Sequence, residues 1–213
     1  AATAFAAPSC ACADKDPHLA LAYGGHADFR GRDATLFNFV SSSDVAVNIK
    51  TEDTLFQLHQ VTVHGSFITE VHFALRTLAG RAFNLTYDAS RMSSHQHSYE
   101  LVNGTCNDKA FVMGLKAARE CDELRAYVEV SALTVDTKRW RFKVAGQPVY
   151  GRLAGPDHRV DLSIELLGEG ALDVHGIIGQ SFDGSEVPRF GRLDQYPPLD
   201  VPADFTTAAM AEG

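Results

Sequence analysis

The chain of 213 residues is 45% hydrophobic and 22% charged, a composition typical of a globular protein with enough apolar material for a core. Its formal net charge of −8, without a stripe of lysine or arginine interleaved with aromatics, argues against a nucleic-acid partner. No apolar run approaches the roughly 20 residues that a membrane-spanning helix needs. The length suits one large β domain or two small ones.

The chain opens with an N-terminal segment, residues 1–13, that is rich in alanine and carries Cys10 and Cys12. Its beginning is small and apolar, as at the end of a removed signal peptide or of a trimmed chain. The central region, residues 14–186, is expected to form one β domain. The last segment, residues 187–213, is expected to run as an extended tail over the domain surface, because it contains the prolines Pro188, Pro197, Pro198 and Pro202.

Most of the central region predicts short strands separated by turn residues. Val45, Val47 and Ile49 alternate with other side chains, which is the period of a half-buried strand. Similar strands are expected at 35–40, 55–58, 61–63, 67–75, 82–87, 127–135, 139–144 and 160–166, and residues 136–138 are expected to join two of them as a hairpin. The pattern predicts an all-β fold with minor α content, as an antiparallel β sandwich or barrel of many short strands.

Helical structure is plausible in one place, between Lys109 and Leu124. This stretch contains good helix formers, including Met113, Leu115 and Ala117. The alternative is a loop held in place by the cysteines near its two ends. The sequence leaves both interpretations open.

The four cysteines, Cys10, Cys12, Cys106 and Cys121, allow three pairings. Cys10 and Cys12 are too close in sequence to pair comfortably with each other. We expect a Cys106–Cys121 bridge, which would close a loop of about 15 residues and stabilise the fold by roughly 3 kcal/mol. The competing pattern joins Cys10 and Cys12 each to one of the later cysteines.

Two sequons for N-linked glycans begin at Asn84 and Asn103. Together with the even number of cysteines, they favour a secreted, extracellular protein.

The stretch from Val174 to Gly184 reads Val-His-Gly-Ile-Ile-Gly-Gln-Ser-Phe-Asp-Gly, with Gly176 and Gly179 at positions that suggest positive φ or a close backbone approach. Near the other end lie Asp16-Pro17-His18 and then Gly-Gly-His-Ala-Asp-Phe-Arg-Gly from Gly24. Together these stretches resemble the von Willebrand factor type D domain. The closing run also resembles that of inter-α-trypsin inhibitor heavy chains and plant root-cap proteins. The resemblance implies a type D-like β domain whose two ends meet.

The resemblance also implies a calcium site. Asp16 and Asp183 correspond to acidic ligands of the family, and Ser185 and Glu186 occupy neighbouring turn positions. Calcium prefers such hard oxygen ligands. The plainer alternative is that Asp183 only forms a turn and Asp16 only a cap. The family's bridge to a cysteine in the closing motif is absent, because Ile178 holds that place.

Histidines offer a second candidate metal site. His95 and His97 would share one face if their stretch were a strand, and they could bind zinc or copper with His59, His64 or His72 as a third ligand. The surrounding Ser, Gln and Arg residues fit a solvated loop equally well. A further histidine, His175, is expected to play a structural role through backbone hydrogen bonds.

Neither a nucleophile elbow nor a phosphate-binding glycine loop occurs in the sequence, so we expect no enzyme. We expect a secreted structural or adhesive module of an extracellular matrix, cell wall or surface filament, with other protein subunits as partners. One alternative is a secreted metal-dependent enzyme or metal carrier that uses His95 and His97. Another is a β sandwich that binds lipid or a small ligand between its sheets.

Overall fold

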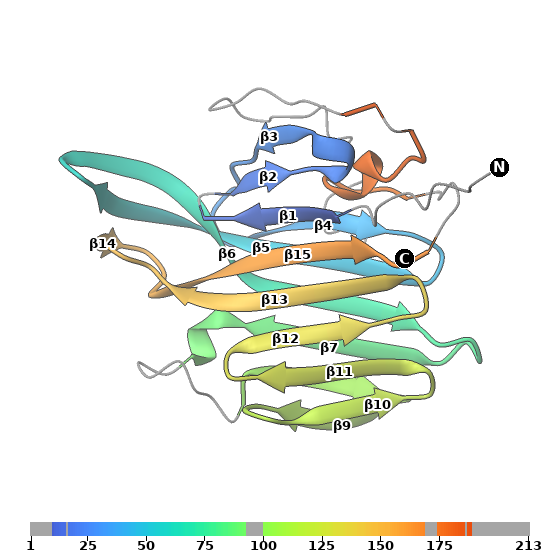
Figure 1. Cartoon of the computed structure of the whole chain (residues 1–213). Coiled ribbons are helices and arrows are strands. Elements are labelled where there is room, and N and C mark those ends of the chain that lie inside the picture. Colours follow the sequence, from blue (N-terminus) through green and yellow to red (C-terminus); the bar gives the residue numbers. More distant parts are fainter. Residues whose placement is uncertain (1–9, 16, 93–99, 169–173, 186, 189–213) are drawn as a thin grey trace.

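The computed structural model describes residues 10–15, 17–92, 100–168, 174–185 and 187–188. Two antiparallel sheets pack face to face as a β sandwich, which confirms the predicted fold class (Figure 1). In this part of the chain, the helical content is confined to 3-10 turns, at Ala22–Gly24 (η1), Ala89–Arg91 (η2) and Gly179–Ser181 (η3). The described residues contain no helix with the length and hydropathy needed to cross a membrane.

The first sheet contains both the opening strands and the last long strand of the domain. Its order is β10-β11-β12-β13-β15-β1-β2-β3. The strand β1 therefore pairs with β15, about 150 residues away in sequence, with Cys12 opposite Ser163. The bounds are β1 Cys10–Asp14, β2 His18–Ala20, β3 His26–Asp28, β10 Ala118–Cys121, β11 Leu124–Glu129, β12 Ala132–Asp136, β13 Trp140–Pro148 and β15 His158–Leu166.

The second sheet is organised around two long strands, β5 and β6. Its order is β14-β5-β6-β7-β8-β9, and β4 pairs with the first half of β5. The bounds are β4 Thr35–Ser41, β5 Val45–Leu58, β6 Val61–Arg76, β7 Ala82–Asp88, β8 Val102–Cys106, β9 Lys109–Met113 and β14 Arg152–Ala154. The strands predicted at 55–58 and 61–63 are thus the ends of longer strands. The register shifts between Lys50 and Thr51, which leaves Thr69 of β6 as the extra residue of a β-bulge.

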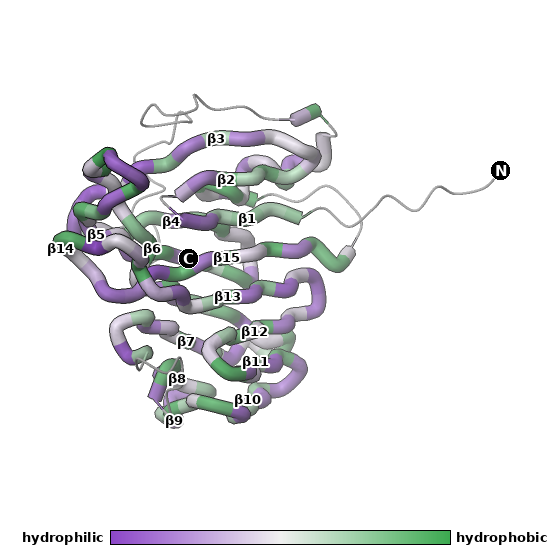
Figure 2. The backbone as a smooth tube through the Cα atoms, turned by 60° about the vertical axis from the view of Figure 1, so that its left-hand side comes forward, coloured by the Kyte–Doolittle hydropathy of each residue, from purple (hydrophilic) through white to green (hydrophobic). Residues whose placement is uncertain are grey.

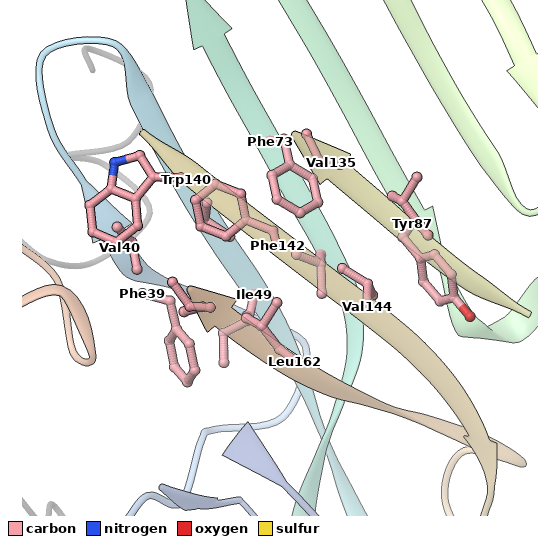
Figure 3. Close-up of a cluster of buried hydrophobic side chains, with 14 of the residues drawn as sticks. Phe39, Val40, Ile49, Phe73, Tyr87, Val135, Trp140, Phe142, Val144 and Leu162 are labelled. Carbon is pink, nitrogen blue, oxygen red and sulfur yellow. The ribbon is translucent and has the colours of Figure 1, made fainter. Parts of the chain in front are cut away.

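Aromatic and aliphatic side chains from both sheets fill the space between them (Figure 3). Phe142 of β13 stacks on Trp140 at 5.9 Å and meets Phe73 of β6 edge-on at 5.5 Å, measured between ring centroids. Along β15, buried and half-exposed residues alternate, and hydrophobic and hydrophilic segments are interspersed along both layers (Figure 2). These aromatic residues are therefore part of the hydrophobic core.

The structure corrects two predictions about secondary structure. The stretch 109–124 is not helical but forms β9, β10 and the first residue of β11. Turns at Asp108 and Lys116, both with positive φ, reverse the chain there. The strand predicted at 127–135 is divided into β11 and β12 by a turn at Val130, whose φ is also positive. Alternation alone misses the turns at Asp108 and Val130 because they contain neither Gly nor Pro, whereas the turn at Lys116 starts at Gly114.

The predicted hairpin at 136–138 is confirmed as the connection between β12 and β13. The hydroxyl of Thr137 accepts a hydrogen bond from the backbone N–H of Trp140 at 2.9 Å, so the turn is held by its own side chain. Most of the N-terminal segment and of the tail lies outside the described residues.

Candidate functional site

The segment 174–182 closes one end of the sandwich by adding to the edge of β4. Backbone hydrogen bonds run in both directions between His175 and Ser41, at 2.8 and 2.9 Å. Further along, the N–H of Ile177 donates to the carbonyl of Asn38, and both Ile177 and Ile178 are fully buried. His175 therefore has a structural role through its backbone, while its side chain is exposed.

Gly176 is required where it stands. Its φ is +101°, and a Cβ added there would lie 2.5 Å from the backbone carbonyl of Phe39 and 2.7 Å from Asn38 Oδ1. The side chain of Asn38 donates to Asn48 Oδ1 at 2.9 Å inside the same region. Both amides are buried, and Asn38 Oδ1 and Asn48 Nδ2 have no hydrogen-bond partner among the described residues. The closing segment thus packs closely against a buried polar pair in the core.

Ser181 joins the closing segment to the opening region. Its buried hydroxyl accepts a hydrogen bond from the N–H of Ala22 at 3.1 Å and donates to the carbonyl of Ile178 at 2.6 Å. The next residue, Phe182, lies edge-on against Trp140 at 5.1 Å. Two regions about 160 residues apart in sequence are therefore in direct contact.

The structure describes only two of the four residues of the predicted calcium site. Asp16 and Glu186 lie outside the described residues. Asp183 is exposed, and its Oδ1 accepts a hydrogen bond from the N–H of Ser185 at 2.9 Å, the arrangement of an Asx turn. Within the described ranges, no three His, Cys, Asp or Glu side chains gather closely enough to hold a metal ion. The calcium site stays a prediction.

The predicted Cys106–Cys121 disulfide is confirmed, and the competing pairing is wrong. It links the end of β8 in one sheet to the end of β10 in the other. Cys10 and Cys12 are free and, two residues apart on β1, share one face. Burial, and then the charge of Asp14, raises the pKa of the Cys12 thiol, which makes it less reactive. Cys10 is exposed.

The two sequons lie on neighbouring strands of the second sheet. Asn84 of β7 is exposed, whereas Asn103 of β8 is partly buried and accepts a hydrogen bond from Arg91 Nη1 at 2.9 Å. Both side chains are therefore on the outer face of the sheet, where a glycan could be attached.

The predicted histidine ligands do not form a site in the described part of the structure. His95 and His97 lie outside the described residues. His59 is in the turn between β5 and β6, with φ +54°, and His64 is exposed on β6. His72 Nδ1 is 3.0 Å from Thr86 Oγ1 on β7.

A polar hollow of about 360 Å³ is lined by Lys50 and Glu52 of β5, Glu70 of β6 and residues 155–158. Lys50 Nζ donates to Glu70 Oε1 at 2.6 Å, and Glu52 Oε1 is 3.1 Å from the same nitrogen. His72 Nε2 is 3.2 Å from Glu70 Oε2 but is not aligned for a hydrogen bond. His72 and Lys50 together lower the pKa of Glu70 to about 2 against the opposing effect of burial. Lys50, with the better geometry, is the firmer partner. Lys50 and His72 therefore already balance the negative charge of Glu70.

The predicted strands 55–58 and 61–63 belong to a hairpin that projects from the sandwich, a feature not predicted from the sequence. We call residues 55–64 the arm; Figure 1 shows it standing clear of the two layers at the left. Cross-strand pairing of Phe56 with Val63 and of Leu58 with Val61 puts these four apolar side chains on one face. Leu58 is 55% exposed and Val61 is 64% exposed. The sequence does contain a sign of this hairpin, because residues 54–69 contain no Asp, Glu, Lys or Arg.

A second loop supports the base of the arm. Its strand β14 pairs with β5, with Arg152 opposite Phe56, and the carbonyl of Gly151 accepts a hydrogen bond from the N–H of Gln57 at 2.8 Å. This loop also exposes Tyr150 (79%) and Leu153 (56%). Apolar side chains from two separate loops therefore gather at this end of the molecule.

No protein-family model matches the chain, and a search of curated proteins found no match.

Proposed function

We propose that this protein is an extracellular structural or adhesive module that binds neighbouring protein subunits through the arm. The observation that supports this proposal is the uncharged hairpin with Leu58 and Val61 exposed on its apolar face. Projecting apolar surface of this kind is costly in water and is typical of protein contact sites. A rigid sandwich behind it gives the contact a fixed position.

Two features favour an extracellular location. The Cys106–Cys121 disulfide is of the kind that persists in oxidising compartments. The sequons at Asn84 and Asn103 lie on the outer face of a sheet, where glycans would not disturb the core. Both features are compatible with a module that works outside the cell.

A relationship to the type D domain belongs to the same proposal. The contact between Ser181 and Ala22 is the kind of meeting of the two ends that the resemblance implies. In that reading Asp16, Asp183, Ser185 and Glu186 bind calcium and stabilise the junction. This part is tested separately by titrating the purified protein with calcium and measuring whether its unfolding temperature rises.

The main experiment places a photoactivatable residue at position 58, in the arm, of the protein made by its native cells. A matched variant carries it at Val112, which is equally exposed on β9. The proposal expects cross-links to other protein chains from position 58 and not from position 112. A protein that stays a lone monomer, or cross-links equally from both positions, would contradict it.

Cys10 offers a covalent route to the same kind of assembly, because it is free and exposed. Its thiol could pair with a cysteine of a neighbouring subunit. Electrophoresis of the native material with and without reductant tests this, with Cys10→Ser as the comparison.

The alternatives have less support. A metal site at His95 and His97 falls on residues outside those described. A lipid between the sheets would have to displace Trp140, Phe142 and their buried neighbours, which fill that space.

A further inference from the structure

The arm has a free strand edge in addition to its apolar face. The strand β6 pairs with β5 along its whole length but pairs with β7 only from Glu70 to Arg76. Among the described residues, no strand lies on the other side of residues 61–69. Of these, the residues from Gly65 onward are buried, so the accessible part of the edge is Val61 to His64.

The hydrogen bond from Gln57 identifies which backbone groups point outward. Because the N–H of Gln57 donates to Gly151, it faces away from β6. Thr62 is directly opposite Gln57, and in an antiparallel ladder opposite residues point their backbone groups the same way relative to the pair. The N–H and C=O groups of Thr62 therefore face away from β5, and those of His64, two residues on, do so too. These groups are available to another strand.

Within the described part of the chain, this edge lacks the features that normally prevent strand addition, namely charges, prolines and coverage. Most other sheet edges carry exposed charged side chains: Lys109 on β9, Arg119 and Glu120 on β10 and Arg152 on β14. The uncharged β4 is covered by the closing segment through His175. The lack of charge and coverage at 61–64, compared with these other edges, favours pairing of this edge with another strand.

We propose that a second copy of this chain pairs with this edge, antiparallel and about a two-fold axis at Val63, so that the two second sheets become continuous. This inference rests on the proposed function and names the partner. Each Thr62 then faces His64 of the second copy, with backbone hydrogen bonds exchanged in both pairs. Val63 lies opposite its own counterpart, a favourable cross-strand pair of β-branched residues.

Charge explains why the partner is a second copy. The chain carries a net charge of −8, so two copies repel each other at most orientations. Residues 54–69 contain no charged side chain, and pairing there brings the copies together where their repulsion is least. The edge is also self-complementary, as a two-fold contact requires.

Sedimentation velocity over a wide range of protein concentration tests the proposal. The wild type should show reversible dimerisation. His64→Pro and Thr62→Pro each remove an outward N–H without breaking the β5–β6 ladder, and each should weaken the dimer about tenfold or more. Val112→Lys, on the edge strand β9, is the matched control and should dimerise like the wild type.

Hydrogen exchange gives a second measurement that needs no variant. In the wild type, the amides of Thr62 and His64 should become protected as concentration rises, while that of Val112 should not. A wild type that remains monomeric, or proline variants that dimerise as strongly as the wild type, would overturn the inference. The broader proposal fails only if position 58 also gives no specific cross-link to any other chain.

Discussion

Asn84 and Thr105 lie directly opposite each other on β7 and β8, with Asn84 Nδ2 3.4 Å from Thr105 Oγ1. Thr86 is likewise opposite Asn103, so each sequon's asparagine faces the other sequon's threonine. Two motifs about 20 residues apart in sequence therefore form one surface patch. Glycans attached there would crowd each other on the same face of the sheet.

The first prediction concerns which sequon is used. In protein made by secreting cells, Asn84 should carry more glycan than Asn103, because Asn84 is exposed whereas Asn103 is partly buried and bound by Arg91. Peptide mass mapping after enzymatic deglycosylation in heavy-oxygen water measures the occupancy of each. A glycan found only on Asn103 would contradict the prediction.

The second prediction concerns the disulfide between the sheets. Replacing Cys106 and Cys121 together by serine should lower the free energy of unfolding by roughly 3 kcal/mol, since the loop that they close contains about 15 residues. Urea unfolding of the double variant and the wild type measures the difference. Cys10→Ser, at an exposed free thiol, is the control and should change the stability by no more than about 0.5 kcal/mol.

The third prediction concerns Gly176. Gly176→Ala should destabilise the protein by about 2 kcal/mol or more, because alanine disfavours the positive φ and its Cβ would collide with the backbone of Phe39. Gly168→Ala is the matched control, since a Cβ there meets no atom within 4 Å. Thermal and urea unfolding compare the two. Equal stabilities for the two variants would show that the closing segment can shift to make room.

The fourth prediction concerns pH. The pKa of Glu70 falls from 4.5 to about 2 on folding, so its contribution to stability is present above pH 4.5 and is lost as the pH falls toward 2. Glu70→Gln should therefore be less stable than the wild type near neutral pH, and the difference should shrink in that acid range. We expect a difference on the order of 1 kcal/mol, because solvent screens these partly exposed groups. Urea unfolding at several pH values measures it, and a difference that does not change with pH would contradict the assignment.

The predictions from sequence succeeded where the sequence signal was local. Alternating side chains identified β15 and the hairpin at 136–138, and loop length favoured the Cys106–Cys121 bridge. They failed at 109–124, where helix-forming residues are drawn into strands by pairing with β8 and β11. Local propensity is weak beside the free energy of packing onto an existing sheet.

At the candidate site, too, the sequence predicted local features and missed those that depend on distant residues. The sequence identified Gly176 as a constrained position, but the constraint comes from Phe39, which is far away in the chain. The sequence shows that residues 54–69 carry no charge, but this did not predict an exposed hairpin. Nothing local determines whether an apolar stretch will be buried or exposed. Asp16, Glu186, His95 and His97 lie outside the described residues, so those site predictions stay predictions.

The sequence by itself determined that this protein is built of antiparallel strands, because a period of two reports directly that one face of each strand is buried. Only the tertiary structure decided which strands are neighbours, and with them the contact of Ser181 with Ala22 and the free edge of β6 at Val61 to His64. The reason is physical: alternation encodes which face of a strand is buried. The partner along its edge depends instead on backbone groups that are the same in every residue except proline.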